Sequence, residues 1–266
     1  MKNTLYRYRP IDEKELDCLK KNELFFASPK DFNDPFDCKN IFSIKDSTDD
    51  DWREFLLGEQ KYKHPALTEN ERQKKVELII KTGVHRDTRN QEDQLRIWKD
   101  LQEEEFNKLG IVCLSHTPND ILMWSHYSNN HQGVCLEFDR QILGTMFHCQ
   151  DVQYCEKYPT FNQFLKELRI SEVAAINDLS LFTKSDHWKH EKECRLIAEP
   201  EIRTDCPGER KYKYPENALT GIIFGCQTKD TDKEKVKDAL KSKEKSIIYY
   251  QAEKSKTMYA VDIKEV

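Results

Sequence analysis

The chain has no apolar run long enough for a transmembrane helix, and nothing near its start combines basic residues with an apolar stretch as a signal peptide does. It also lacks a large excess of either charge, because 34% of its 266 residues are charged and yet the formal net charge is only -5. No global field therefore draws the protein to nucleic acid or to a membrane, although a local basic groove is compatible with this composition. We expect a cytoplasmic protein that does not contact a membrane.

The nine cysteines include no C-x-x-C pair, so neither a disulfide framework nor a zinc ribbon is indicated. Cys113 and Cys135 stand in apolar runs, which is typical of buried reduced thiols. His116, His126 and His131 raise the alternative of a metal site, but a spacing of five between the last two does not match the i, i+4 pair of a helical zinc site. The sequence therefore predicts no metal-binding residues.

Strand and helix signals alternate from the start of the chain. TLYRYR alternates as a strand does, and the next segment has Asp12 as a candidate N-cap, Glu15 three residues later and an expected end near Asn22. ELFFAS then resumes strand character. SPKDFNDPFD, which is crowded with proline, asparagine and aspartate, predicts an ordered loop.

A change of composition from about Thr48 to Leu109 indicates long polar helices, with a capping box at Thr68 and plausible helix ends at Gly83 and Gly110. Strand character returns in GIVCLSH, GVCLEFD, CRLIAE, LTGIIFG, SIIYYQ and MYAVDI, and a stretch with helical spacing lies at 161–181. Short strands with helices between them indicate an α+β fold with a mixed, largely antiparallel sheet. We expect a single domain over residues 1–266 with a mostly helical insertion at about 45–109.

The segment SHTPNDILMWSHYSNNHQGVCLEF carries the first candidate site. Thr117 followed by Pro118 predicts a helix start, and the helix itself is expected over 121–128. Trp124 and Tyr127 are three apart and share a face of that helix. Their spacing alone favours a core role for both rings, whereas the polar residues that crowd the same turn favour a binding site.

The opening YRYR places Tyr6 and Tyr8 on one face of the first strand and Arg7 and Arg9 on the other. An arginine in a strand either extends towards solvent at an edge or faces an anion, and the guanidinium group suits phosphate. Both uses remain open for these two arginines.

Glu191 and Glu193 stand two apart just before an apolar run in HWKHEKECRLI. If that run is a strand, their side chains lie on one face, where like charges repel unless cations or a substrate compensate them. Lys184 and Arg195 flank the pair. A plain ion-pair network is therefore one explanation of the glutamates, and a substrate site is the other.

Four blocks, LYRYR, FFASPKDFNDPFD, MWSHYSNNHQGVCLEFD and FTKSDHWKHEKECRLI, occur in this order. Together they resemble a large bacterial family that is labelled as a domain of unknown function. The blocks span most of the chain and leave the helical segment and the C-terminal strands unaccounted for. The family label itself implies no activity.

The same order of elements is more distantly similar to the ADP-ribosyltransferase superfamily. There the first strand holds NAD, an aromatic ring packs on nicotinamide, and the last glutamate of an E-x-E pair contacts the nicotinamide ribose. The resemblance implies that Glu193 is catalytic and that Glu191 assists the acceptor. The implied NAD-binding candidates are Tyr6, Arg7, Tyr8, Arg9, Ser28, Asn33, Asp34, Trp124, Tyr127, Lys184 and Arg195, with Trp124 or Tyr127 as the nicotinamide platform.

The glutamate pair suits this chemistry. Cleavage of the nicotinamide glycosidic bond passes through an oxocarbenium-like transition state, which one carboxylate stabilises while a second accepts a proton from the attacking group. We expect an NAD-dependent ADP-ribosyltransferase-like enzyme that modifies RNA, DNA or protein. The resemblance implies a bacterial toxin or phage-defence effector with an antitoxin or chaperone partner. For a nucleic-acid acceptor, RKYKYP and KEKVKDALKSKEK are basic candidates, and a solvated face is the alternative use of the latter.

Two other classes compete with the transferase hypothesis. A metal-dependent phosphodiesterase or nuclease would bind Mg²⁺ through Asp34, Asp37 and the two glutamates, with Lys184 on the scissile phosphate. A non-catalytic binding or regulatory module would use WSHY and the glutamate pair as a recognition pocket. Asn33 and Asp34 also have a simpler use, because both are natural turn formers. Magnesium dependence distinguishes the first class, and metal-free release of nicotinamide distinguishes the second.

Overall fold

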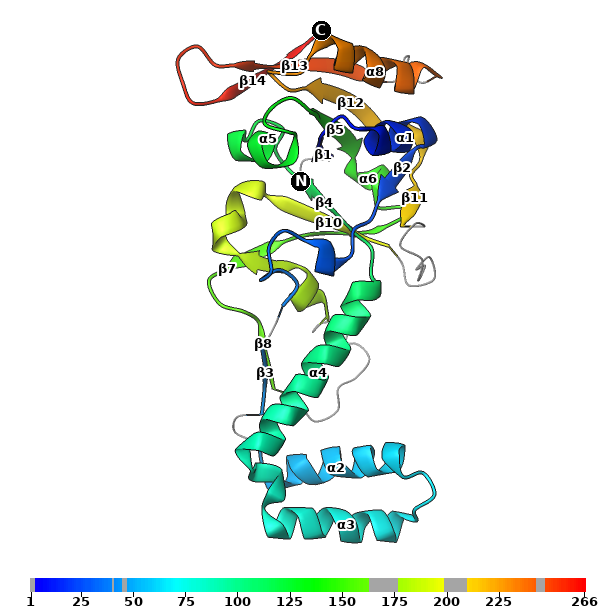
Figure 1. Ribbon diagram of the computed structural model, residues 1–266, viewed down its shortest axis with the longest axis vertical. Helices are drawn as coiled ribbons and strands as arrows, with labels where there is room; N and C mark the ends of the chain where they lie inside the picture. The colour runs from blue at the N-terminus through cyan, green and yellow to red at the C-terminus, as the bar shows by residue number, and fades with distance from the viewer. Residues whose placement is uncertain (1–2, 40, 45–46, 163–176, 199–209, 243–246) are drawn as a thin grey trace. The chain divides into compact units, whose positions relative to one another are not determined.

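The computed structural model describes the chain except for residues 1–2, 40, 45–46, 163–176, 199–209 and 243–246 (Figure 1). The chain forms two compact units. The first comprises Met1–Asp37, Phe106–Glu156 and Phe182–Val266, and the second comprises Cys38–Glu105 and Lys157–Leu181. The chain therefore leaves the first unit and returns to it twice.

An eight-stranded sheet organises the first unit, in the order β14-β13-β12-β5-β1-β4-β10-β6. Its neighbouring strands are antiparallel except for β12 and β13, which are parallel. The α+β fold with a mixed, largely antiparallel sheet is thereby confirmed. The strands are β1 (Thr4–Arg9), β4 (Ile111–Ser115), β5 (Val134–Asp139), β6 (His148–Asp151), β10 (Glu193–Ile197), β12 (Leu219–Phe224), β13 (Ile248–Lys254) and β14 (Val261–Glu265).

Two small strand pairs and several helices complete the described part of the first unit. The antiparallel pair joins β2 (Glu23–Phe25) to β11 (Lys211–Lys213), and the parallel pair joins β7 (Gln153–Cys155) to β9 (Thr183–Ser185). The helices are α1 (Glu13–Lys21), α5 (Ile121–Tyr127), α6 (Arg140–Leu143) and α8 (Asp230–Leu240), with 3-10 turns η1 (Pro29–Asp31), η3 (Asp186–Glu191) and η6 (Glu216–Ala218).

Local chemistry sets the limits of α1. The Asp12 side chain accepts a hydrogen bond from the backbone N–H of Glu15, which satisfies a free donor at the helix start. Asn22 adopts a left-handed conformation with φ of 55° and ends the helix. Both limits agree with the prediction from the sequence.

The two faces of the large sheet are covered by different helices (Figure 1). On one face, the α1 face, the paired residues Leu5 and Phe138 belong to the main hydrophobic core together with residues of α1 and α8. On the other, the α5 face, the paired residues Tyr8 and Cys135 pack with Trp124 of α5. Alternation along the strands of the large sheet therefore assigns their residues to one of these two faces, apart from an irregularity near the start of β12.

The second unit is mainly helical over residues 49–105. Capping boxes at Thr48 and Thr68 begin its first two helices, and Gly83 ends the second with φ of 71°. Trp52 and Val76 belong to the hydrophobic cluster between those helices. The elements are β3 (Ile41–Ser43), α2 (Asp49–Lys63), α3 (Glu69–Thr82), η2 (Val84–Arg86), α4 (Thr88–Lys108, whose last turn belongs to the first unit) and β8 (Thr160–Asn162), which pairs with β3.

Helices occur where the sequence predicted them, at about 45–109, and the compact unit that contains them also includes residues 157–181. Most of the stretch with helical spacing at 161–181 lies outside the described residues. Among the residues that the structure describes, no helix is both long and apolar enough to cross a membrane.

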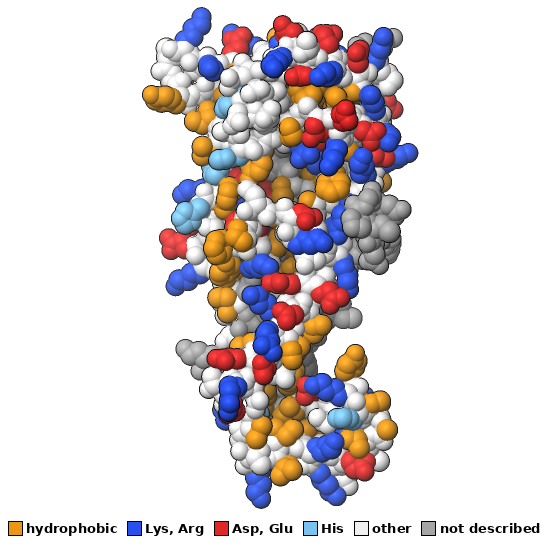
Figure 2. Space-filling model, viewed as in Figure 1, with side chains coloured by type: hydrophobic (Ala, Val, Ile, Leu, Met, Phe, Trp, Pro, Cys, Tyr) orange, Lys and Arg blue, Asp and Glu red, His pale blue; other side chains and the backbone are white. Residues whose placement is uncertain are grey.

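Charged side chains of both signs are interspersed over the visible surface (Figure 2). On α8, Lys233, Lys235 and Lys237 each pair with an acidic residue three positions earlier on the same helix. These three lysines are therefore neutralised locally, which favours a solvated helix face over a nucleic-acid patch, and the end of the basic stretch at 243–245 lies outside the described residues.

Candidate functional site

A buried lysine lies at the centre of the candidate site. Lys184 Nζ on β9 is 2.6 Å from Glu191 Oε2, 3.0 Å from Glu193 Oε2 and 3.5 Å from Asp37 Oδ2. All four side chains have at most 6% of their surface exposed. One ammonium group therefore holds three carboxylates within its reach, away from most of the solvent.

Arg195 on β10 supplies the second cation. Its Nε donates to Glu193 Oε1 at 2.7 Å, and its guanidinium nitrogen NH2 donates to the Asp37 oxygens at 2.8 and 2.7 Å. The arginine is 0% exposed. We call the five charged groups the ion network: Asp37, Lys184, Glu191, Glu193 and Arg195.

The ion network carries a surplus of negative charge when all its groups are ionised. Three carboxylates give a charge of -3 and the two cations give +2, so the sum is -1. An excess of negative charge among these five groups would suit a cation or a transition state with positive charge.

The two glutamates come from different elements, a 3-10 turn and a strand, which the sequence did not predict. Glu191 ends the turn η3, and Lys192 follows with φ of 45°, so only Glu193 belongs to the strand. The expectation that both carboxylates share one strand face is therefore wrong. Ser115 Oγ donates to the Glu191 carbonyl at 2.6 Å, and the Glu193 N–H donates to the Tyr154 hydroxyl at 2.7 Å.

The electrostatics keep the central groups charged. Burial alone would raise the pKa of Glu193, but Arg195 and Lys184 favour its ionised form and lower the pKa below the usual glutamate value. Burial would lower the pKa of Lys184, but the carboxylates of the ion network raise it above the usual lysine value. At neutral pH, the strand glutamate is thus a carboxylate and the lysine an ammonium.

Tyr127 connects α5 to the ion network. Its hydroxyl donates to Glu191 Oε1 at 2.6 Å, and Asn33 Nδ2 lies 3.5 Å from the same hydroxyl. Burial, followed by the charge of Glu191, raises the pKa of Tyr127, so the phenol stays protonated and able to donate. The structure therefore brings together Tyr127, Asn33 and both glutamates, as well as Lys184 and Arg195, from the candidates that the sequence provided.

The rest of α5 faces the core. Trp124 is 0% exposed, its ring packs edge-on against Tyr8 at 5.1 Å between centroids, and its Nε1 donates to the Pro118 carbonyl. The helix begins after Asp120, whose side chain accepts from two backbone N–H groups, so the expected start with Thr117 as its cap is wrong. Trp124 thus holds the helix in place, and Tyr127 is the ring that reaches the carboxylates.

The candidates on β1 divide between the two faces of the sheet. Tyr6 pairs with Ser115, which pairs with Glu193, so Tyr6 lies in one row with that glutamate on the α5 face. Arg7 and Arg9 lie on the α1 face, where Arg7 NH2 donates to the Phe25 carbonyl and Arg9 binds Glu15 at 2.7 Å. The sheet therefore separates both arginines from the ion network.

Three further candidates have local structural contacts. The Tyr8 hydroxyl donates to the Thr117 carbonyl at 2.7 Å, and Ser28 Oγ donates to the Asn107 carbonyl at 2.9 Å. Asp34 Oδ1 accepts from the Phe36 N–H at 2.9 Å, as a turn-forming aspartate does. Their observed contacts stabilise the loop and the core, not the ion network.

Residues that the sequence did not place in the leading site also border the ion network. The Trp188 ring lies 5.2 Å from Lys184 Nζ, and the Phe32 ring lies 5.7 Å from the Arg195 guanidinium. Cys113 belongs to β4 and lies directly opposite Arg195 across the strand pair. Its side chain is exposed although β4 is an inner strand of the sheet, so the expectation of a buried thiol at this position is wrong.

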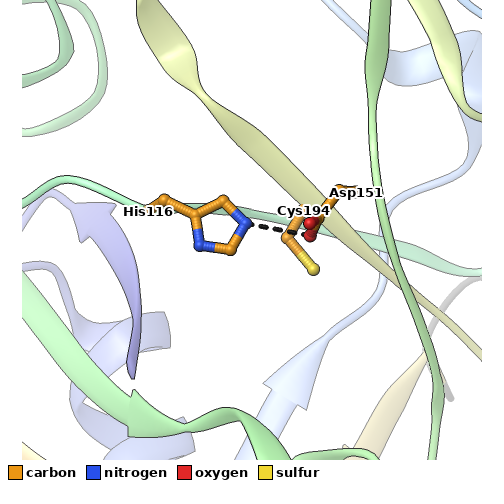
Figure 3. Close-up of side chains that lie close together, drawn as sticks. All are labelled: His116, Asp151 and Cys194. Carbon is orange, nitrogen blue, oxygen red and sulfur yellow. Dashed lines mark hydrogen bonds and ion pairs between the residues drawn. The ribbon is translucent and has the colours of Figure 1, made fainter. Parts of the chain in front are cut away.

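Potential metal ligands gather elsewhere. Within the described residues, the group of three such ligands consists of His116, Asp151 and Cys194, whose donor atoms lie within 4.8 Å of one another (Figure 3). The other histidines considered from the sequence lie apart from it, with His126 exposed on α5 and the His131 ring stacked on Trp124. In the ion network, the Lys184 ammonium occupies the position between the carboxylates that a Mg²⁺ ion would need.

Comparison with known proteins gives one match. No curated protein and no solved structure matches the chain. A family model described as a protein of unknown function, DUF2971, matches residues 123–196. The matched stretch contains Tyr127, Lys184, both glutamates and Arg195, and it excludes Asp37 and β1. The similarity to the ADP-ribosyltransferase superfamily is not shown, whereas the resemblance to a family of unknown function is confirmed by this match to DUF2971.

Proposed function

We propose that this protein is an NAD-dependent ADP-ribosyltransferase-like enzyme that modifies a macromolecule. The observation that carries the proposal is the surplus charge of the ion network, where three buried carboxylates oppose two cations. Cleavage of a glycosidic bond develops positive charge on the sugar, and fixed negative charge lowers the energy of that transition state. The surplus negative charge thus supports a reaction centre that becomes cationic.

The two glutamates take different parts in the proposed reaction. The bond between ribose C1′ and the nicotinamide nitrogen breaks, and its electron pair leaves with nicotinamide. Glu193, which its two cationic neighbours hold ionised, stabilises the positive charge on the ribose. The acceptor's nucleophilic atom then bonds to C1′, and Glu191 takes the proton that this atom loses. The products are nicotinamide and an ADP-ribosylated acceptor.

NAD can reach the two glutamates only between the side chains that cover them, because each glutamate is only 3% exposed. We place the entry at the exposed side chain of Cys113, which lies within hydrogen-bonding reach of Glu193. Tyr127, half-buried and bound to Glu191, is the aromatic ring assigned to nicotinamide. Arg7 and Arg9 are not assigned to the pyrophosphate in this proposal, since they lie on the α1 face.

The biological setting rests on the distant sequence resemblance. We propose that the enzyme acts in the cytoplasm as a toxin or phage-defence effector, that its acceptor is a protein or nucleic acid, and that an antitoxin or chaperone binds it. The locally paired lysines of α8 give no support to a nucleic-acid acceptor at that helix.

A second candidate function is a non-catalytic binding or regulatory module. The observation in its favour is the closure of the ion network, in which each charged side chain already has partners and little exposed surface. The metal-dependent phosphodiesterase is not proposed again, because the Lys184 ammonium lies between its intended ligands and the Asp34 side chain forms a turn instead.

The decisive experiment follows nicotinamide release from NAD by purified protein in metal-free buffer, with ADP-ribosylated products detected by mass spectrometry. Glu193→Gln should lower turnover by about 10²-fold or more, since a neutral amide does not offset developing positive charge. Glu191→Gln should impair transfer to the acceptor more than hydrolysis of NAD. Glu15→Gln is the matched control, because this glutamate is equally buried and also binds an arginine, but on the α1 face.

The control variant should lose stability and keep its turnover. Wild-type protein that leaves NAD intact with a broad panel of cellular protein and RNA would contradict the transferase and leave the binding module. Thermal unfolding of every variant excludes misfolding as the cause of a lost signal.

A further inference from the structure

Donor atoms from three strands meet at the β6 edge of the sheet, on the face opposite Glu193. Asp151 at the end of β6 lies directly across from Cys194 of β10, and His116 follows β4 with its N–H bonded to the Lys192 carbonyl. His116 Nε2 lies 2.9 Å from Asp151 Oδ1. Figure 3 shows the His116 imidazole joined to the Asp151 carboxylate, with Cys194 beside the carboxylate.

A fourth donor stands beside these three. Cys149 precedes Asp151 by two positions on β6, so both side chains point to the same face. Its sulfur lies 3.2 Å from the sulfur of Cys194. Two thiols, one imidazole and one carboxylate therefore converge from positions that are far apart in sequence, and none of them belongs to the ion network.

We propose that these four side chains form a structural zinc site. Thiolate and imidazole ligands select zinc over hard ions such as Mg²⁺ and Ca²⁺, and four protein ligands complete the tetrahedron of a structural site. Zinc bonds of ~2.0–2.3 Å hold tetrahedral ligand atoms ~3.3–3.8 Å apart. The observed 2.9 and 3.2 Å separations are shorter by a few tenths of an ångström, which side-chain rotation corrects.

Arg140 is the competing cation at this position. Its buried NH1 nitrogen forms an ion pair with Asp151 Oδ1 at 2.9 Å, and His116 Nε2 contacts the same oxygen. Asp151 has a second carboxylate oxygen, so zinc on one oxygen leaves the other for the guanidinium. A hydrogen-bonded ligand carboxylate of this kind is usual in metal sites, where the outer partner fixes the ligand's orientation.

The zinc site would stabilise the pairing of the edge strand β6 with the rest of the sheet. β6 is an edge strand and is only four residues long, and short edge strands depend on neighbouring contacts to stay paired. Ligands from β6, from β10 and from the end of β4 tie three adjacent strands together. The site stabilises the strand that carries Glu193 and has no residue in common with the ion network. The zinc proposal can therefore be tested independently of the proposed transferase activity.

Uptake of zinc alone by the reduced, metal-free full chain tests this site. Native mass spectrometry should find one zinc ion per chain, and the melting temperature should rise when zinc is added, because zinc binds the folded state. Co²⁺ in place of zinc should give a thiolate-to-metal absorption band. His116→Gln and Cys149→Ser should each weaken zinc binding by about 10²-fold or more, since even outer partners of ligands matter by about 10- to 100-fold.

Cys226→Ser serves as the matched control, because this partly buried thiol lies in the turn after β12 and should leave zinc binding unchanged. His116 is partly exposed, so its substitution should not prevent folding. The proposal is overturned if the reduced wild type takes up no stoichiometric zinc, or if both ligand variants bind as the wild type does. A Cys149–Cys194 disulfide that forms in air, with no zinc uptake after reduction, also overturns it.

Discussion

Glu193 and Cys194 are consecutive residues of β10, but their side chains enter opposite faces of the sheet and two different chemical settings. On the α5 face, hard oxygen and nitrogen groups are closed off and bound to one another as ions. On the α1 face, soft and borderline donors lie at a partly exposed edge. Strand alternation thus lets one short segment support two sites that separate substitutions can test.

Arg195→Met should have the largest effect on this comparison. The change leaves Asp37 and Glu193 without their main cation in a buried setting, which typically costs about 3–5 kcal/mol of the free energy of unfolding. Urea denaturation measures the loss. Arg53→Met is the control: this partly exposed arginine also binds two carboxylates, and its removal should change stability little. An equally small effect of Arg195→Met would show that the buried ion pairs contribute no more to the free energy of unfolding than exposed ones do.

Acid should have the second-largest effect, by weakening the ion pairs of Glu193 on the α5 face and so lowering the free energy of unfolding. The folded-state pKa of Glu193 is below its ordinary value of 4.5, so its contribution is present above pH 4.5 and is lost as the pH falls towards the lowered folded value. Lys184 has a raised pKa, so its contribution is present below pH 10.5 and is lost only as the pH rises further. The urea concentration at the midpoint of unfolding should therefore fall from pH 7 to pH 4 and again from pH 4 to pH 3. Glu193→Gln should flatten this decline, and an unchanged slope in the variant would assign the acid sensitivity to other groups.

Tyr127→Phe should have the smallest effect of the three. It removes one hydrogen bond to a carboxylate and preserves the ring, which corresponds to about 1.5–3 kcal/mol of the free energy of unfolding. Asn33→Ala should cost less, because its contact with the same hydroxyl is 3.5 Å long and exposed. Neither change should alter zinc uptake at the opposite face. A loss of zinc in either variant would show that the two sites are coupled.

Local signals in the sequence predicted local features well. The Asp12 cap, the Asn22 end and the Thr68 capping box depend on a few adjacent residues, and each occurs where expected. The strand at TLYRYR and its division of tyrosines from arginines follow from alternation alone. Fold class followed from the same kind of evidence.

The ion network depended on contacts that no local signal contains. Asp37 meets Arg195 across 158 positions, so the loop aspartate was considered only as a metal ligand. Lys192 has a positive φ although it is neither glycine nor asparagine. The sequence therefore contained no signal for the bend that separates Glu191 from the strand. The edge strand at His148–Asp151 gave no clear strand pattern, although Cys149 and Asp151 alternate along it. Without that strand, the gathering of donors beside Cys194 had no sequence signal.

The ion network also stands where the chain passes between its two units. Asp37 is the last residue before the first departure, and Lys184 follows two positions after the final return at Phe182. Tyr154, which accepts the Glu193 N–H, stands two positions before the second departure at Glu156. Asp37, Tyr154 and Lys184 thus lie within two positions of three of the four points at which the chain changes unit. Their contacts therefore hold the start of the first excursion and both ends of the second, and help to offset the entropy lost in closing such long loops.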